Sequence, residues 1–243
     1  MSGHFSAENI GHGQPDHTPR PASGHQPEHF VFDEASEAEI GVILARYPEG
    51  RQASGVIPLL YIVQRQMGRV TGSAWLPRVG MDVVAARLGM PPIRVYEVAT
   101  FYLMFNTKPI GRYHLQVCTT TPCWLRGSSD ITSACKSAAG IKQFGETSAD
   151  GLFTMSEVEC LGACANAPIL QIDDDFYEDL DGPRTVALIE ALRRGESPTP
   201  GPTIDRFNSA PVGGRITLLI DPTVVPEEKT ADVTSEVTPG ATA

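Results

Sequence analysis

Two closely spaced pairs of cysteines constrain this sequence more than any other feature. Four residues separate Cys118 from Cys123, and three separate Cys160 from Cys164. Each pair begins where a predicted strand ends, so all four thiols can lie in adjacent loops at one end of a sheet. The remaining cysteine, Cys135, falls on the apolar face of a predicted helix, so we expect it in the core and not at a site.

The chemistry of the four paired thiols limits what they can bind. Thiolates are soft ligands that suit zinc or an iron–sulfur cluster, whereas calcium and magnesium prefer oxygen ligands. Two separate pairs fit a [2Fe–2S] cluster, in which each iron takes two thiolates. Structural zinc sites also pair cysteines two to four residues apart, so the spacing leaves zinc open. A thioredoxin-type dithiol would need C-x-x-C, which is absent.

Charge and hydropathy exclude other classes of protein. The 243-residue chain has a formal net charge of −10, whereas nucleic-acid binders usually carry a basic surface. No stretch approaches the roughly 20 apolar residues of a membrane-spanning helix. Residues 1–29 contain a single basic residue, Arg20, and no apolar segment, so we expect neither a secretory nor a mitochondrial signal. In a reducing compartment, clustered cysteines more often bind metal than form disulfides.

Hydrophobic periodicity divides the chain into four parts. Residues 1–29 and 195–243 are rich in proline and poor in aromatic residues, which predicts a disordered N-terminal tail and a largely disordered C-terminal extension. Residues 30–107 show a helical pattern and predict a helical bundle. Residues 108–194 alternate between strand and helix patterns. The predicted fold class is therefore α+β.

Local signals place the individual elements. Ser36 and Glu39 form a capping-box signature at the start of the first helix. A second helix is expected over residues 54–67, with Gly68 as its stop. Two more helices are expected at 82–88 and after Pro91-Pro92. In the second part we expect strands at 113–117 and 153–159, helices at 128–139 and 183–194, and a hairpin of 169–172 and 176–180 around Asp173–Asp175. A short β-prone run, Arg215–Asp221, stands out in the C-terminal extension.

Several motifs follow one another in the order of a known family. They are Ala99-Thr-Phe-Tyr102, Lys108-Pro-Ile-Gly-Arg-Tyr-His114, Cys118-Thr-Thr-Thr-Pro-Cys123, Glu157-Val-Glu-Cys-Leu-Gly-Ala-Cys164, Asn166-Ala-Pro168 and Tyr177-Glu-Asp-Leu180. Over about residues 34–194 the chain closely resembles the small [2Fe–2S] flavoprotein-arm subunits of NADH–quinone oxidoreductase (respiratory complex I). That resemblance implies a helical bundle followed by a thioredoxin-like domain. It also implies one [2Fe–2S] cluster with Cys118, Cys123, Cys160 and Cys164 as ligands.

The resemblance further implies an electron-transfer subunit without catalytic residues of its own. NADH and FMN would bind to a partner flavoprotein subunit, with which the cluster exchanges single electrons. The chain lacks G-x-G-x-x-G and G-x4-G-K-[ST], in keeping with that division of labour. Other peripheral-arm subunits would hold the chain at the cytoplasmic face of a bacterial inner membrane, without nucleic acid and without direct membrane insertion.

Three alternatives remain beside this interpretation. The same fold and ligands would serve the diaphorase module of an NAD-linked hydrogenase or formate dehydrogenase. A zinc-stabilised interaction module would use the same cysteines. A helix-turn-helix rhythm runs through residues 85–98, but its second helix is mostly apolar, which favours packing over DNA binding.

Two details of the site stay open at this point. Pro168 precedes a strand, where either a cis or a trans peptide bond fits. The carboxylates of Glu157, Glu159 and Asp173–Asp175 would disfavour reduction of a cluster if they lay close to it.

Overall fold

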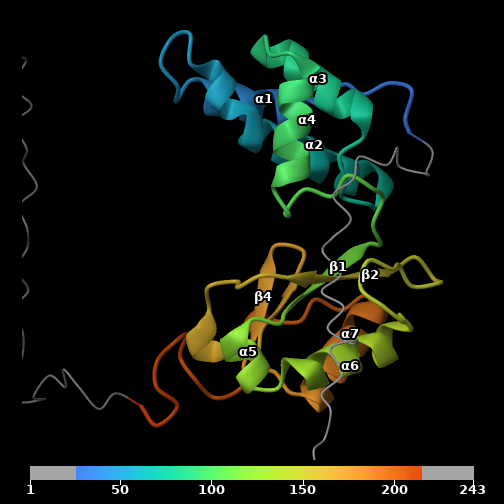
Figure 1. Ribbon diagram of the computed structural model, residues 1–243, viewed down its shortest axis with the longest axis vertical. Helices are drawn as coiled ribbons and strands as arrows, with labels where there is room; N and C mark the ends of the chain where they lie inside the picture. Colours follow the sequence, from blue (N-terminus) through green and yellow to red (C-terminus); the bar gives the residue numbers. More distant parts are fainter. Residues whose placement is uncertain (1–25, 215–243) are drawn as a thin grey trace, which may run out of the picture.

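The structure, a computed structural model, describes residues 26–214 (Figure 1). Its helices are α1 (Glu34–Leu44), α2 (Val56–Thr71), α3 (Arg78–Leu88), α4 (Pro92–Phe101), α5 (Thr121–Leu125), α6 (Ser128–Ala139) and α7 (Gly182–Arg193), with 3₁₀ turns η1 (Gln52–Gly55) and η2 (Cys164–Asn166). Its strands are β1 (Tyr113–Cys118), β2 (Phe153–Val158), β3 (Leu170–Ile172), β4 (Asp175–Glu178) and β5 (Gly201–Pro202). We call α1–α4 the helical unit and the chain from β1 onward the sheet unit. Among residues 26–214, none of the helices has both the length and the apolar character needed to cross a bilayer.

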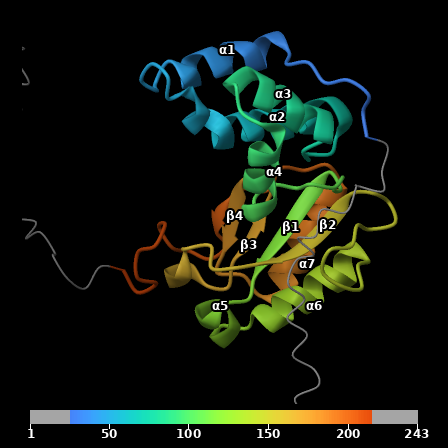
Figure 2. The ribbon, with the colours of Figure 1, turned by 45° about the horizontal axis from the view of Figure 1, so that its top comes forward.

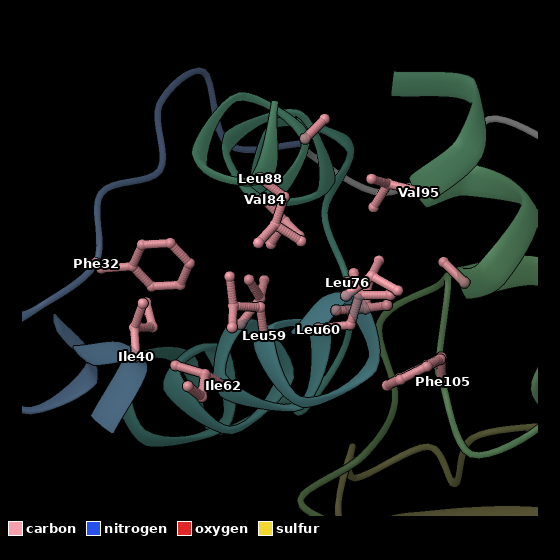
Figure 3. Packing of buried hydrophobic residues seen from close by; sticks show 14 of the residues in the cluster. Phe32, Ile40, Leu59, Leu60, Ile62, Leu76, Val84, Leu88, Val95 and Phe105 are labelled. Atoms are coloured by element: carbon pink, nitrogen blue, oxygen red, sulfur yellow. The ribbon is translucent and has the colours of Figure 1, made fainter. Parts of the chain in front are cut away.

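The helical unit packs around one face of α2. Leu59 and Leu60 are completely buried there, and Val84 of α3 and Val95 of α4 close over them (Figure 3). Apolar residues three and four positions apart on a helix form such a continuous stripe. Val95 of α4 lies in this core. The apolar residues of the helix-turn-helix pattern in α3 and α4 therefore pack against α2, as the sequence indicated.

Several helix boundaries differ from the sequence prediction; α3, for example, begins at Arg78 and not at residue 82. The side chain of Asp33, and not that of Ser36, caps α1, accepting the Ser36 N–H at 2.7 Å. Asp33 is the residue whose carboxylate reaches a free amide of the first turn. The second helix continues through Gly68 to Thr71 and ends at Gly72, which has φ +76°. Gly68 is needed inside the helix, because a Cβ atom there would lie 3.2 Å from that of Ala74.

The sheet has the order β2-β1-β3-β4-β5. The interior strand β1 runs parallel to β2 and antiparallel to β3, and β3 and β4 form the expected hairpin. Helices α6 and α7 lie side by side on the sheet face that points away from the helical unit (Figure 2). A second core forms between them and the sheet, with Leu115, Phe153 and Ile189 completely buried. Helices and a mixed sheet make this an α+β chain, as predicted.

Hydrogen bonds join the two units along the chain between α4 and β1. Gln64 of α2 accepts the Asn106 N–H at 2.8 Å and donates to the Met104 carbonyl at 3.0 Å. Across the surface, Arg65 pairs with Asp174 of the hairpin turn at 3.4 Å. The segment that enters β1 is thus held by the helical unit before the sheet begins.

The C-terminal extension departs from expectation over residues 195–214. We expected residues 195–243 to be largely disordered, but β5 pairs in parallel with Tyr177 and Glu178 of β4. The Thr203 N–H adds a bond to the Glu178 carbonyl at 3.0 Å. An unpaired outer strand offers free backbone groups, and this segment satisfies them on β4. The β-prone run Arg215–Asp221 lies outside the described residues.

Candidate metal centre

The two cysteine pairs lie at the carboxyl ends of adjacent parallel strands. Cys118 is the last residue of β1, and Cys160 lies two residues after β2. Because β1 and β2 run in the same direction, their carboxyl ends meet at one edge of the sheet. Cys123 follows in α5, and Cys164 begins η2. The expected position at one end of the sheet is therefore observed, although Cys123 is helical and not in a loop.

The pairs differ in their access to solvent. Cys118 and Cys123, the inner pair, are both 1% exposed, whereas Cys160 and Cys164, the outer pair, are exposed. Within the outer pair the two Sγ atoms are 3.4 Å apart. The inner pair lies in one small core, in which Cys118 and Cys123 pack with Ala167 and Ile169. The pairs also interact electrostatically, because Cys118 raises the pKa of both Cys123 and Cys164.

Hydrogen-bond donors surround the thiols. The Gly162 N–H donates to Cys160 Sγ at 3.4 Å, and the Thr120 hydroxyl lies 3.3 Å from Cys118 Sγ. Gly162 has φ +85°, a conformation that glycine adopts without steric cost. The backbone of Leu161 lowers the pKa of Cys118, and the backbone of Ile169 lowers that of Cys123. Such donors stabilise negative charge on sulfur, which is what a thiolate ligand requires.

The pKa values show one thiol of each pair favoured as thiolate. Burial raises the pKa of Cys118, but hydrogen bonds from Thr120 and from the Leu161 backbone outweigh it and leave the pKa lowered. The Gly162 amide lowers the pKa of Cys160. Burial, with the neighbouring Cys118, raises the pKa of Cys123 to about 12, and the Cys160 contact raises the pKa of Cys164.

The donor set suits a binuclear cluster. Among residues 26–214, no three His, Cys, Asp or Glu side chains converge on one metal position. A [2Fe–2S] cluster needs two thiolates at each of two irons, and here the four thiols form one pair in the core and one exposed pair with sulfurs 3.4 Å apart. The Gly162 N–H faces the Cys160 sulfur, and such donors stabilise thiolate ligands.

Comparison with known proteins identifies the family. Residues 40–193 match the family described as thioredoxin-like [2Fe-2S] ferredoxin. The chain belongs to this family. A subunit of the NADH-quinone oxidoreductase of Rickettsia conorii is 50% identical over 164 residues, which are 68% of this chain and 95% of that protein. The mitochondrial NADH dehydrogenase [ubiquinone] flavoprotein 2 of Dictyostelium discoideum is 47% identical over 197 residues, covering 80% of this chain and 77% of that protein.

A solved structure shares the fold at low sequence identity. An NAD⁺-reducing [NiFe]-hydrogenase in its H₂-reduced state aligns with a TM-score of 0.51 and 22% identity. The alignment covers 60% of this chain and 23% of that one. The two chains therefore share the arrangement of helices and strands of the thioredoxin-like ferredoxins.

Cys135 stands apart from the other cysteines of this thioredoxin-like ferredoxin. It lies in α6, completely buried in the core with Ile131 and Phe153. Burial raises its pKa to about 12, so the thiol stays protonated. Its surroundings are those of a small apolar core residue, as expected from the helix pattern.

The acidic residues suggested by the sequence do not gather in one place. Glu159 lies beside Cys160 and raises the pKa of that thiol electrostatically, against the stronger effect of the Gly162 amide. Asp173 instead sits at the opposite end of β1, where its N–H donates to the His114 carbonyl at 3.1 Å. Strands rise by about 3.4 Å per residue, so His114 and Cys118 are about 14 Å apart. Asp173 therefore does not lie close to the thiols, which was the condition for an effect of the Asp173–Asp175 run on reduction.

A cleft of about 660 Å³ opens between the two units, away from the thiols. Arg65 and Arg112 line it together with His114 and Asp173, and no cysteine is among its lining residues. The four thiols and this cleft therefore lie toward opposite ends of β1.

We call the segment from Cys160 to Asn166, which carries the outer cysteine pair, the ligand loop. The sequence did not predict the residues that pack against its inner side. Asn166, two residues after Cys164, is completely buried, and the following Ala167–Pro168 bond is cis. Ala167 and Ile169 pack against Cys118 and Cys123 in a small third core. The motif Asn166-Ala-Pro168 was visible in the sequence, but its partners lie far along the chain.

Proposed function

We propose that this chain holds one [2Fe–2S] cluster through Cys118, Cys123, Cys160 and Cys164 as a subunit of an NADH–quinone oxidoreductase. The observation that carries this proposal is the meeting of two thiol pairs at the carboxyl ends of β1 and β2. Membership of the thioredoxin-like [2Fe-2S] ferredoxins and relatives named for NADH-quinone oxidoreductase and NADH dehydrogenase support it.

A bound cluster of this kind accepts and releases single electrons. The chain's own residues prepare for that role in two ways. Cys118 and Cys123 anchor the inner side against the core, while Cys160 and Cys164 leave the outer side open to a partner. Backbone amides from the Gly162 loop compensate negative charge on the sulfurs. Trp124 and Leu125, which follow Cys123 in α5, are exposed apolar side chains.

The electron donor in this proposal is the FMN of a partner flavoprotein subunit, which also binds NADH. Other peripheral-arm subunits join the pair to the membrane at the cytoplasmic face of a bacterial cell. The missing nucleotide motifs support a partner that carries both nucleotides. In this arrangement no residue of the chain is catalytic, and its contribution is to hold and tune the cluster.

The hydrogenase alternative uses the same centre with other partners. Its support is the fold shared with an NAD⁺-reducing [NiFe]-hydrogenase, whereas the relatives of 47–50% identity are named for quinone reduction. Purification of the chain with its native partners separates the two. Quinone-reducing membrane-arm subunits support our proposal, and a nickel–iron or molybdenum subunit supports the alternative.

Spectroscopy of the full chain tests the metal centre directly. We expect iron and acid-labile sulfide in the ratio of one [2Fe–2S] cluster per chain, and a rhombic EPR signal after reduction. Single Cys→Ser changes at positions 118, 123, 160 and 164 should each remove or alter that signal, because each removes a thiolate ligand. Cys135→Ser is the matched control and should leave it unchanged.

Two outcomes would overturn the proposal. A colourless protein with one zinc per chain would establish the zinc-stabilised interaction module instead. Loss of the signal in Cys135→Ser, with an intact signal in one of the other four variants, would refute the ligand set.

A further inference from the structure

One arginine from the C-terminal extension reaches the back of the ligand loop. Arg206 Nη1 donates to the Ala165 carbonyl at 3.0 Å and to Asn166 Oδ1 at 2.8 Å. Both acceptors follow Cys164 directly in the chain. The same Nη1 atom lies 3.5 Å from Asp179 Oδ1. A single guanidinium therefore links the ligand loop to the residue that follows β4.

This contact is more buried than the ion pairs on the surface of the chain. The side chains of Arg206 and Asp179 are 10% and 6% exposed, whereas Arg194 and Glu196 are 58% and 56% exposed. Exposed pairs contribute little because water screens them. Removing one partner of a buried pair leaves an uncompensated charge, which is strongly destabilising.

Asn166 makes hydrogen bonds to β4, to the residue that follows β4, and to the C-terminal extension. Its Oδ1 accepts from Arg206, and its Nδ2 donates to Glu178 Oε2 and to the Asn208 carbonyl. Its backbone carbonyl accepts the Asp179 N–H at 2.7 Å. The contacts to Arg206 and Asn208 come from 40 and 42 residues further along the chain. The loop after Cys164 is thus fixed by a segment that β5 anchors to β4.

Two polar atoms of the contact have no hydrogen-bond partner within the described residues. They are Asp179 Oδ2 and Arg206 Nε, both buried. A guanidinium holds its N–H groups in a fixed planar fork, whereas a lysine ammonium is a compact point charge. Lysine is therefore not an equivalent replacement for Arg206.

We propose that Arg206 is a positioning residue for the metal centre, which clamps the Ala165–Asn166 turn and thereby fixes the Cys164 thiol. The inference rests on the proposed function, because a fixed thiol matters only to a bound cluster. Groups that orient metal ligands from behind commonly change metal affinity about 10- to 100-fold when mutated. The positive charge of Arg206 also favours reduction of a nearby cluster, since reduction adds a negative charge.

The test compares Arg206→Ala with Arg206→Lys in the full chain. Hydrogen exchange of the cluster-free protein reports the clamp alone, through the amides of Asn166 and Ala167, which bond to Ala163 and Cys164. We expect faster exchange there in both variants, more so in alanine than in lysine, and unchanged exchange in α6. In cluster-loaded protein, we expect cluster loss to a chelator to be about 10- to 100-fold faster in Arg206→Ala. The midpoint potential should fall in Arg206→Ala and be restored in part by Arg206→Lys.

Arg194→Ala is the matched control, because it removes an arginine next to the C-terminal extension from an exposed pair. Equal exchange, cluster loss and potential in Arg206→Ala and Arg194→Ala would overturn the inference. If Arg206→Ala does not fold, Arg206→Lys decides, and wild-type exchange at Asn166 and Ala167 in that variant refutes the clamp. Wild-type protein that binds no iron would refute the proposed function, while the exchange data would still decide whether Arg206 holds the loop.

Discussion

Ser73 and Ile110 exchange two hydrogen bonds through one hydroxyl group. The Ile110 N–H donates to Ser73 Oγ at 2.9 Å, and that oxygen donates to the Ile110 carbonyl at 2.7 Å. Ser73 follows α2, and Ile110 lies three residues before β1. The half-buried Ser73 hydroxyl therefore bonds both backbone groups of Ile110. It joins the end of the helical unit to the segment that leads into β1.

Removing that hydroxyl should lower the stability of the whole chain. We expect Ser73→Ala to reduce the free energy of unfolding by about 1–3 kcal/mol, because the amide and carbonyl of Ile110 both lose their partner. Chemical denaturation measures the change. Ser133→Ala is the control, since its hydroxyl bonds the Ser129 carbonyl at the exposed surface of α6. A loss no larger than that of the control would show that water replaces Ser73 without cost.

The ligand loop depends on one glycine conformation. Gly162→Ala should destabilise the loop by about 1–2 kcal/mol, because φ +85° is unfavourable for any residue with a Cβ atom. Gly41→Ala is the opposite case, since Gly41 lies within α1 with no atom within 4 Å of an added Cβ. We expect it to stabilise the chain by about 0.5–1 kcal/mol. Thermal denaturation and cluster retention of the two variants should move in opposite directions, and parallel changes would contradict this explanation.

His114 makes the stability of the sheet unit dependent on pH. Burial lowers the pKa of its imidazole to about 4, and its Nε2 lies 2.8 Å from Ser156 Oγ. Since the unfolded chain binds this proton near pH 6.5, acidification below about pH 6.5 favours unfolding until about pH 4 is reached. The contribution of His114 is therefore full above about pH 6.5 and lost as the pH falls.

A non-titrating replacement should remove that dependence. Between about pH 7 and pH 5, the stability of His114→Gln should gain about 2 kcal/mol relative to wild type. Asp173, whose pKa burial raises to about 6, opposes His114 in both proteins and cancels in the comparison. Urea denaturation at several pH values measures the difference. A difference between His114→Gln and wild type that stays constant with pH would contradict this explanation.

The two groups of acidic residues should affect the metal centre unequally. Glu159→Gln should raise the midpoint potential of the cluster, because Glu159 lies beside Cys160. Asp174→Asn removes the same charge at the far end of β1, where its side chain is exposed and screened by solvent, and should leave the potential nearly unchanged. EPR-monitored redox titration distinguishes them, and equal shifts would mean that distance from the thiols does not govern the effect.

The elements that were foreseeable are those with strong local patterns. Helix α6 has the predicted bounds because its apolar face repeats regularly and Gly140 stops it. The meeting of Cys118 and Cys160 was foreseeable because each follows a strand, and the ends of parallel strands lie together. In each case the signal lies within a few residues of the position that it predicts: the glycine follows the helix, and each cysteine follows its own strand.

Other features could not be predicted from the sequence, because the element is too short to show a periodic pattern or because the contact joins distant parts of the chain. Helix α5 has five residues, too few to display a helical period around Cys123. Strand β5 has two residues and exists because the edge of β4 is free to receive it. Nothing around Arg206 indicates its role, since its partners Ala165 and Asn166 lie 41 and 40 residues earlier in the chain.

The position of the clamp has a consequence for biogenesis. Asn208 contacts Asn166 across 42 residues of sequence, so the cysteine loop leaves the ribosome well before the segment that secures it. During that interval the thiols of Cys160 and Cys164 are already synthesised while the loop behind them is still free. Until Arg206 and Asn208 have been made, the loop behind these thiols lacks two of the contacts that hold Asn166.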